Sequence, residues 1–227
     1  GLAFGDFEGT ALLEKARATE VQDPEAALEL YHGYLASAAF GVGRQQARMK
    51  ARMIQDALDR GDGQALGRFL AILQERDAGR FDRALEGCAR FRSRFRKTGL
   101  LDDVSHLEAY ILLVDLGATS RAIEAYADFI TRFPESSYYD SALYGLASAY
   151  EESGAAARSG DLFRKLMDRH TAFRLPVGDV AFPKDGYLSR VWFTKADRRL
   201  TRLRSLEQAR SAAREALSRA GSPTGMG

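Results

Sequence analysis

Apolar residues recur at three- and four-residue spacing through most of the chain, and this pattern predicts amphipathic helices rather than strands. In the segment SALYGLASAYEES, one such stripe is formed by Leu143, Leu146, Ala147 and Tyr150. Similar stripes lie at residues 12–20, 23–35 and 44–60. The chain is therefore expected to be all-α.

A repeat underlies the helical pattern. The segments ALEGCARFRSRFRK and AIEAYADFITRFPE begin at Ala84 and Ala122, and a weaker copy, SGDLFRKLMDRH, begins at Ser159, which gives offsets of 38 and 37 residues. Fixed periods of this length indicate stacked helix pairs. Glycine adopts the left-handed conformation of a helix C-terminus at low cost, so a glycine is expected between the two helices of each pair. Such a glycine precedes each copy, at Gly79, Gly117 and Gly154.

Several residues predict where individual helices begin and end. Asp23 is expected to be an N-cap, because Pro24 after it suits the first position of a helix. Pro134 cannot continue a helix and restricts Phe133, so the helix before it should end there. Ser137 followed by Asp140 predicts a capping box at the next helix.

The predicted architecture is a right-handed α-solenoid of stacked antiparallel helix pairs. Its expected parts are a helix pair plus an extra helix (1–62), three helix pairs (63–170), an aromatic loop (171–194), a final helix (195–220) and a disordered tail (221–227).

The end of the chain departs from the repeat. Aromatic residues are too apolar to lie free in water, so those of the loop are expected to pack on the last helix pair and cap the stack. They are Trp192, Phe193, Phe182 and Tyr187. The final helix is expected to direct one stripe inward, composed of Leu200, Leu203, Ala209, Ala213 and Leu217.

The repeats resemble tetratricopeptide repeats, with small and large residues at the usual positions of that family. The segment FPESSYYDSALYGLASAYEESG is most similar to the bacterial envelope branch, which includes outer-membrane assembly lipoproteins of the BamD type and the periplasmic coordinator of the Tol–Pal system. The matching residues are Pro134, Ser136, Tyr138, Ala142, Tyr144 and Leu146. This resemblance implies a protein-binding scaffold in a Gram-negative envelope, periplasmic or associated with the outer membrane. A cytoplasmic location is the alternative.

Composition narrows the class of protein only slightly. Apolar residues make up 45% and charged residues 28%, with a net charge of +2, which is ordinary for a globular chain. The single Cys88 excludes an intramolecular disulfide and a cysteine-based zinc site. No apolar run reaches the roughly 18 residues of a membrane-spanning helix. The N-terminal GLAFGDF contains no intact signal peptide and fits either a mature end or a trimmed one.

The segment RFRSRFRK, residues 90–97, is the most basic part of the repeat region. We interpret it as a packed helix, with Phe91 and Phe95 on the inner face and the arginines on the solvated flank. The alternative is a nucleic-acid-associated protein that uses this segment and the final helix, in which eight basic and three acidic residues give +5.

The chain shows no clear catalytic or cofactor-binding motif. The histidines His32, His106 and His170 are far apart in the sequence, and none has a second ligand at metal spacing. The segments with paired glycines lack the third glycine and the preceding strand of a dinucleotide site. No nucleophile is accompanied by a base. The sequence therefore favours a non-enzymatic protein without a cofactor, and an enzyme on a helical scaffold is the least favoured hypothesis.

Stacked helix pairs present a concave surface that holds extended or helical peptides of a partner protein. The resemblance places its groove-facing positions at Phe69, Leu73, Arg76, Leu107, Ile111, Asp115, Tyr144, Ser148 and Glu151. The alternative is that the apolar members of this set are core residues, or that the chain's own helices fill the groove.

Overall fold

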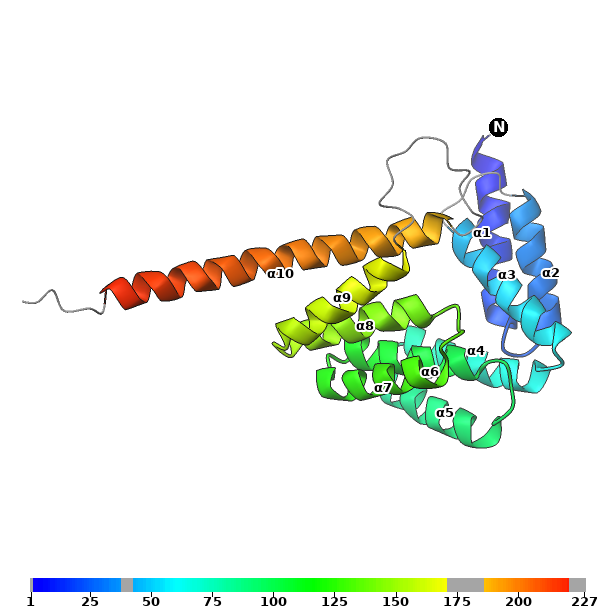
Figure 1. Cartoon of the computed structure of the whole chain (residues 1–227). Helices are drawn as coiled ribbons and strands as arrows, with labels where there is room; N and C mark the ends of the chain where they lie inside the picture. The colour runs from blue at the N-terminus through cyan, green and yellow to red at the C-terminus, as the bar shows by residue number, and fades with distance from the viewer. Residues whose placement is uncertain (1, 38–42, 171–185, 221–227) are drawn as a thin grey trace, which may run out of the picture. The chain divides into compact units, whose positions relative to one another are not determined.

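The computed structural model describes residues 2–37, 43–170 and 186–220, and every regular element in these ranges is helical. The chain divides into two compact units, Gly1–Leu116 and Gly117–Gly227. Within each unit, helices that follow one another in sequence pack side by side (Figure 1). The predicted all-α solenoid of consecutive helix pairs is confirmed.

The first unit contains six α-helices and one π-helical turn in its described residues. These are α1 (Leu2–Thr19), α2 (Pro24–Ser37), α3 (Arg44–Asp59), α4 (Gly63–Asp77), α5 (Phe81–Arg94), α6 (Leu101–Tyr110) and the π-helix η1 (Ile111–Asp115).

The second unit contains α7 (Thr119–Arg132), α8 (Tyr139–Glu152), α9 (Ala156–Arg169) and α10 (Gly186–Ala220). In this unit α7 packs on α8, α8 on α9, and α9 on α10. The aromatic loop and the tail were predicted for segments of which residues 171–185 and 221–227 lie outside the described part of the chain.

The repeat predicted from the sequence is visible in the core. Equivalent positions at the start of α5, α7 and α9 carry the fully buried Ala84, Ala122 and Ser159. One turn further, the buried side chains of Cys88, Tyr126 and Phe163 occupy another equivalent position. Different residue types fill the same place in each copy, because burial selects for side chains that fit the local space.

The turns between paired helices repeat as well. Gly79, Gly117 and Gly154 have φ angles of 72°, 61° and 81°, the left-handed region predicted for them. The residue that follows each glycine has nearly the same conformation in all three turns, with φ between −90° and −79° and ψ between 58° and 63°. These shared dihedral angles confirm the phase assigned to the repeat.

Two predicted helix starts have different outcomes. The N-cap at Asp23 is confirmed, since its Oδ1 accepts a hydrogen bond of 2.9 Å from the N–H of Ala26. The capping box at α8 is wrong. Asp140 instead accepts bonds of 2.8 Å from Arg169 and 3.0 Å from His170, both at the end of the neighbouring α9. The tertiary ion pair thus uses the carboxylate that the local motif required.

The final helix ends at Ala220 as predicted but begins earlier than predicted. It begins at Gly186 rather than near Lys195, so Trp192 and Phe193 are helical. Both rings pack on the cluster of α8 and α9 that contains Phe163, as predicted for them. Their packing explains the earlier start, because helix stability in proteins comes mainly from a buried face. The equivalent prediction for Phe182 and Tyr187 concerns side chains outside the described set.

The inward stripe predicted for α10 is only half correct. Leu200 is buried and Leu203 is partly buried. Farther along, Ala209 and Ala213 are exposed, and 72% of Leu217 is accessible. The helix continues past the pair against which its first half packs (Figure 1). Residues 204–219 therefore have an amphipathic pattern that no helix in the described part of the chain covers.

Gly145 marks a close approach of α7 and α8. A Cβ atom at this position would lie 2.4–2.8 Å from atoms of the buried Tyr126 ring. We expect Gly145→Ala to lower the free energy of unfolding by about 1–3 kcal/mol, because the ring is held in the core and must shift. Urea denaturation followed by circular dichroism measures this change.

Gly33 provides the matched control for this substitution. It lies within α2, and a Cβ there would meet nothing within 4 Å. Gly33→Ala should therefore raise stability by up to about 1 kcal/mol, from helix propensity alone. Equal effects of both substitutions would show that the contact with Tyr126 is not what excludes a side chain from position 145.

Candidate functional site

Three of the predicted groove residues lie in the hydrophobic core of the first unit. Phe69, Leu107 and Ile111 are 4%, 8% and 0% exposed and belong to one cluster of buried side chains. Leu73 is partly buried against the same cluster. The prediction that Phe69, Leu107 and Ile111 face the groove is therefore wrong, and the alternative that they are core residues is correct. The periodicity of their helix shows a stripe, and a stripe has the same form on a groove and in a core.

Two polar residues that were predicted to face the groove, Arg76 and Asp115, pair with each other in the first unit. Arg76 of α4 donates hydrogen bonds of 2.7 Å and 3.3 Å to the carboxylate of Asp115 in η1, 39 residues away. Its guanidinium also lies over the ring of Tyr110, 4.7 Å from the centroid. The bonds to Asp115 raise the pKa of Arg76 above its ordinary value. This pair joins two helices and leaves neither charge free to recruit a ligand.

In the second unit, α10 covers the predicted groove positions of α8. The ring of Tyr144 packs against Trp192 at a centroid distance of 5.7 Å, and Lys195 lies over the same ring. Farther along α8, Glu151 forms ion pairs of 3.4 Å with Arg199 and 3.9 Å with Arg202. The third position, Ser148, is buried. The chain's own final helix therefore occupies this part of the surface.

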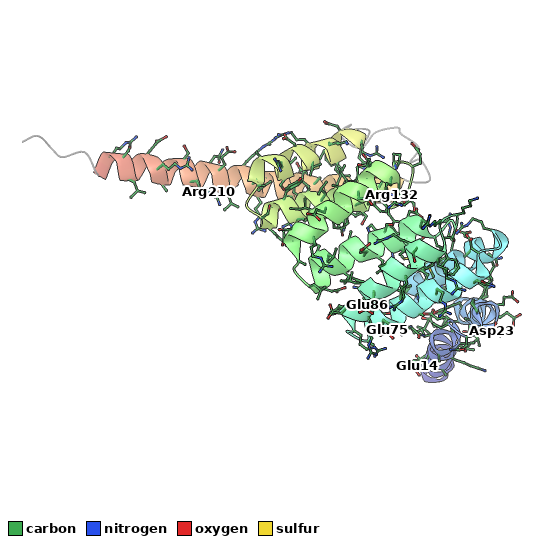
Figure 2. All side chains as sticks on the ribbon, turned by 90° about the horizontal axis from the view of Figure 1, so that it is seen from below. Glu14, Asp23, Glu75, Glu86, Arg132 and Arg210 are labelled. Carbon is green, nitrogen blue, oxygen red and sulfur yellow. The ribbon has the colours of Figure 1, made fainter. Side chains whose placement is uncertain are left out.

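The basic segment 90–97 is structural in its apolar half. Phe91 and Phe95 stack at a centroid distance of 5.0 Å, and the equivalent Phe129 and Phe133 stack at 5.2 Å. In both copies an arginine one residue before the second ring lies over it, Arg94 at 5.5 Å and Arg132 at 5.2 Å. Arg132 is labelled in Figure 2. The same motif at two repeat positions supports the interpretation of this segment as a packed helix.

Two further arginines of the segment are paired with acidic residues. Arg90 bonds with Glu86 one turn earlier, and Arg92 bonds with Glu108 of α6. Four arginines nevertheless line a groove of about 580 Å³ between α4 and α5. They are Arg68, Arg83, Arg90 and Arg94. This groove is the structural basis of the nucleic-acid alternative.

The residues with reactive side chains show no shared centre. Within the described ranges, no group of three or more His, Cys, Asp or Glu residues is placed to hold a metal ion. Cys88 is buried, and burial raises the pKa of its thiol to about 12. Since the thiolate is the nucleophilic form, this cysteine is unreactive at neutral pH.

His106 is a partly buried histidine of α6 with a lowered pKa. Burial lowers its pKa from 6.5 to about 4, and the nearby Asp102 opposes this effect. The unfolded chain therefore binds more protons between these values, so stability is full above pH 6.5 and falls as the pH drops toward 4. We expect a loss of about 2–3 kcal/mol over this range.

The contribution of His106 is isolated by comparing pH profiles of unfolding. His106→Gln should remove this part of the acid sensitivity, while the carboxylates continue to titrate. His32→Gln on α2 is the control, because that side chain is exposed. A wild-type slope that persists in His106→Gln would assign the acid sensitivity to other groups.

A groove between α9 and α10 was not predicted from the sequence. The two helices diverge toward the N-terminus of α9 (Figure 1), and a groove of about 610 Å³ opens there. Small residues of α9 form one wall, and leucines and arginines of α10 form the other. The apolar stripe of α10 is the sequence signal of this groove, because its second half is exposed rather than packed inward.

These features define an all-α helical-repeat protein in which paired helices build the core and leave helix faces accessible. Residues 108–136, from the end of α6 through α7, match the tetratricopeptide repeat family. The chain therefore carries a tetratricopeptide repeat within a TPR-like all-α fold. No curated protein sequence matches it.

Tetratricopeptide repeats generally mediate protein–protein interactions, and proteins built from them are typically scaffolds rather than enzymes. In the part of the chain that the structure describes, no helix is long and apolar enough to cross a membrane.

Proposed function

We propose that the chain is a non-enzymatic adaptor that binds a partner polypeptide within a bacterial cell-envelope complex. The observation that carries the proposal is the repeat itself, which brings side chains of successive helices onto shared surfaces, as Arg76 and Asp115 illustrate. The envelope assignment, periplasmic or associated with the outer membrane, depends on the resemblance of residues 133–154 to the envelope branch of the family.

Burial and packing change where the partner is expected to bind. Phe69, Leu107 and Ile111 are core residues, and α10 lies over Tyr144. The accessible candidates are therefore surfaces of α9, α10 and the α4–α5 pair, rather than the full concave set. A partner protein, without a cofactor, is the ligand class that helical grooves of this kind accommodate.

Retention of proteins from an envelope extract on the immobilised chain tests the adaptor function. We expect specific partners to be retained at physiological ionic strength and identified by mass spectrometry. Bait carrying both Ile111→Glu and Phe163→Glu, one fully buried position in each unit, should be unfolded throughout and controls for non-specific adhesion to exposed apolar surface. Equal retention on both baits would contradict the proposal.

Cell fractionation tests the proposed compartment separately. The native protein should appear in the periplasmic or outer-membrane fraction of the source cells. Recovery in the cytoplasmic fraction alone would reject the envelope assignment while leaving protein binding open.

The arginine-lined groove between α4 and α5 favours nucleic-acid binding as the second candidate. Contacts with several phosphates release counterions, so affinity for a polyanion would fall steeply with salt. An adaptor should instead show little binding to DNA or RNA at physiological ionic strength. Fluorescence anisotropy with labelled oligonucleotides across a salt series separates the two functions.

A further inference from the structure

The floor of the groove between α9 and α10 is apolar. On α10, Leu200 is buried, Leu203 is partly buried, and Leu206 is 44% exposed at the point where the helices separate. On α9, the facing wall includes the small residues Ala156, Ala157 and Gly160 beside the charged Asp161 and Arg164. These small side chains allow another helix to approach the backbone of α9 closely.

The charges around this floor are unevenly paired. Arg164 pairs with Asp161 on α9, and Glu151 is paired with Arg199 and Arg202. In contrast, three arginines of α10 that line the groove have no acidic partner among the described residues. They are Arg204, Arg210 and Arg214. Glu207 is the one acidic lining residue without a described pair, so the rim has a positive excess.

The exposed half of α10 arranges these groups along one face. Leu203, Leu206, Arg210 and Arg214 follow one another at spacings of three and four residues, which places them on the same side of a helix. Arg210 is labelled on this half of α10 in Figure 2. The face thus changes from apolar, beside the start of α9, to basic farther out. A helix lying along it would meet leucines first and arginines afterwards.

The apolar part of the groove could hold either a second copy of the chain or a helix of another protein. The charges around the groove distinguish these two occupants. A second copy of the chain would bring its own α10, whose residues 204–219 contain four arginines and two glutamates. Two such segments side by side would repel each other. A helix with acidic residues would instead pair with the free arginines.

We propose that this groove docks an amphipathic helix of a partner protein, with apolar residues set on Leu203 and Leu206 and acidic residues set on Arg210 and Arg214. The proposal rests on the adaptor function and names the chemistry of its partner. Acidic flanks provide selectivity and faster association, while the apolar contacts hold the complex together.

A pair of labelled synthetic helices tests the proposal by fluorescence anisotropy with the full chain. In both peptides, one half carries leucines at three- and four-residue spacing. The other half carries glutamates in the first peptide and lysines in the second. The glutamate peptide should bind roughly tenfold or more tightly than the lysine peptide at low salt, and this advantage should shrink as salt rises.

Reversing the charge of Arg210 and Arg214 in the protein tests whether these arginines recognise the acidic half of the peptide. Arg210→Glu with Arg214→Glu should weaken binding of the glutamate peptide roughly tenfold and should favour the lysine peptide instead. Both side chains are exposed, so the variant is expected to fold. Arg96→Glu with Lys97→Glu makes the same change in net charge at exposed positions elsewhere and should leave both affinities unchanged. Leu206→Asn should weaken binding of both peptides.

Equal binding of the two peptides, or no effect of the reversal at Arg210 and Arg214, would overturn the proposal. Failure of both peptides to bind, together with a dimer in analytical ultracentrifugation that Leu206→Asn dissociates, would assign the groove to a second copy. If reversal at Arg210 and Arg214 leaves retention of extract partners intact, the adaptor function stands and only its location is wrong. If the wild-type chain retains no partner, the adaptor function itself fails.

Discussion

Ile111→Glu is expected to unfold the first unit or to destabilise it by about 4 kcal/mol or more. Ile111 is fully buried in the cluster that also contains Phe91 and Leu107. A carboxylate there would lose its hydration without gaining a described cationic partner, and the apolar contacts of the isoleucine would be lost as well. Urea denaturation and thermal melting by far-UV circular dichroism measure the effect.

The control lies in the same π-helical turn. Val114 is 56% exposed, so Val114→Glu places the same charge on the same element at the surface. Its stability should stay within about 0.5 kcal/mol of the wild type. A mild effect of Ile111→Glu, similar to that of Val114→Glu, would show that position 111 is accessible and would restore it to the groove.

Glu20→Ala should cost about 3–5 kcal/mol, because Glu20 is the centre of a buried polar network. Its carboxylate is 4% exposed, accepts a hydrogen bond of 2.8 Å from Tyr31 and pairs with Lys50 at 2.9 Å. Removal of the carboxylate leaves the ammonium group of Lys50 and the hydroxyl of Tyr31 without this partner in the core of α1, α2 and α3. Chemical denaturation measures the loss.

A second substitution distinguishes an unpaired charge from simple loss of packing. Lys50→Met in the Glu20→Ala background removes the stranded cation and should recover a large part of the lost stability. Glu29→Ala, at an exposed position of α2, should change little. The absence of recovery in the double variant would show that the ion pair does not carry the stability of this network.

Local signals predicted the helices and most of their ends well. Gly79, Gly117 and Gly154 are recognisable because only a glycine adopts their left-handed conformation without strain. Asp23 before Pro24 is recognisable because a cap depends on neighbours in the sequence. Asp140 shows the limit of such motifs. Its carboxylate fits a capping box in sequence, but α9 offers Arg169 and His170, and the tertiary contacts prevail.

The candidate site was much less predictable than the helices. Arg76 and Asp115 were predicted to face the groove, and the structure shows that they pair with each other. Ile111 was placed on a surface but is buried, because an apolar stripe indicates that a helix has a covered face without indicating what covers it. The apolar stripe of α10 was predicted to face inward over its whole length for the same reason, but its second half is exposed.

By itself, the sequence determined the elements and their repeat: the apolar period, the glycine turns and the matched phenylalanine pairs are local or repeated signals. Only the tertiary structure decided which helix faces are covered. The start of α10 packs on α8 and α9 through Trp192. The rest of α10 extends beyond the end of that pair. The groove and its free arginines result from the angle between two helices. That angle depends on packing between residues distant in sequence, which no local pattern encodes.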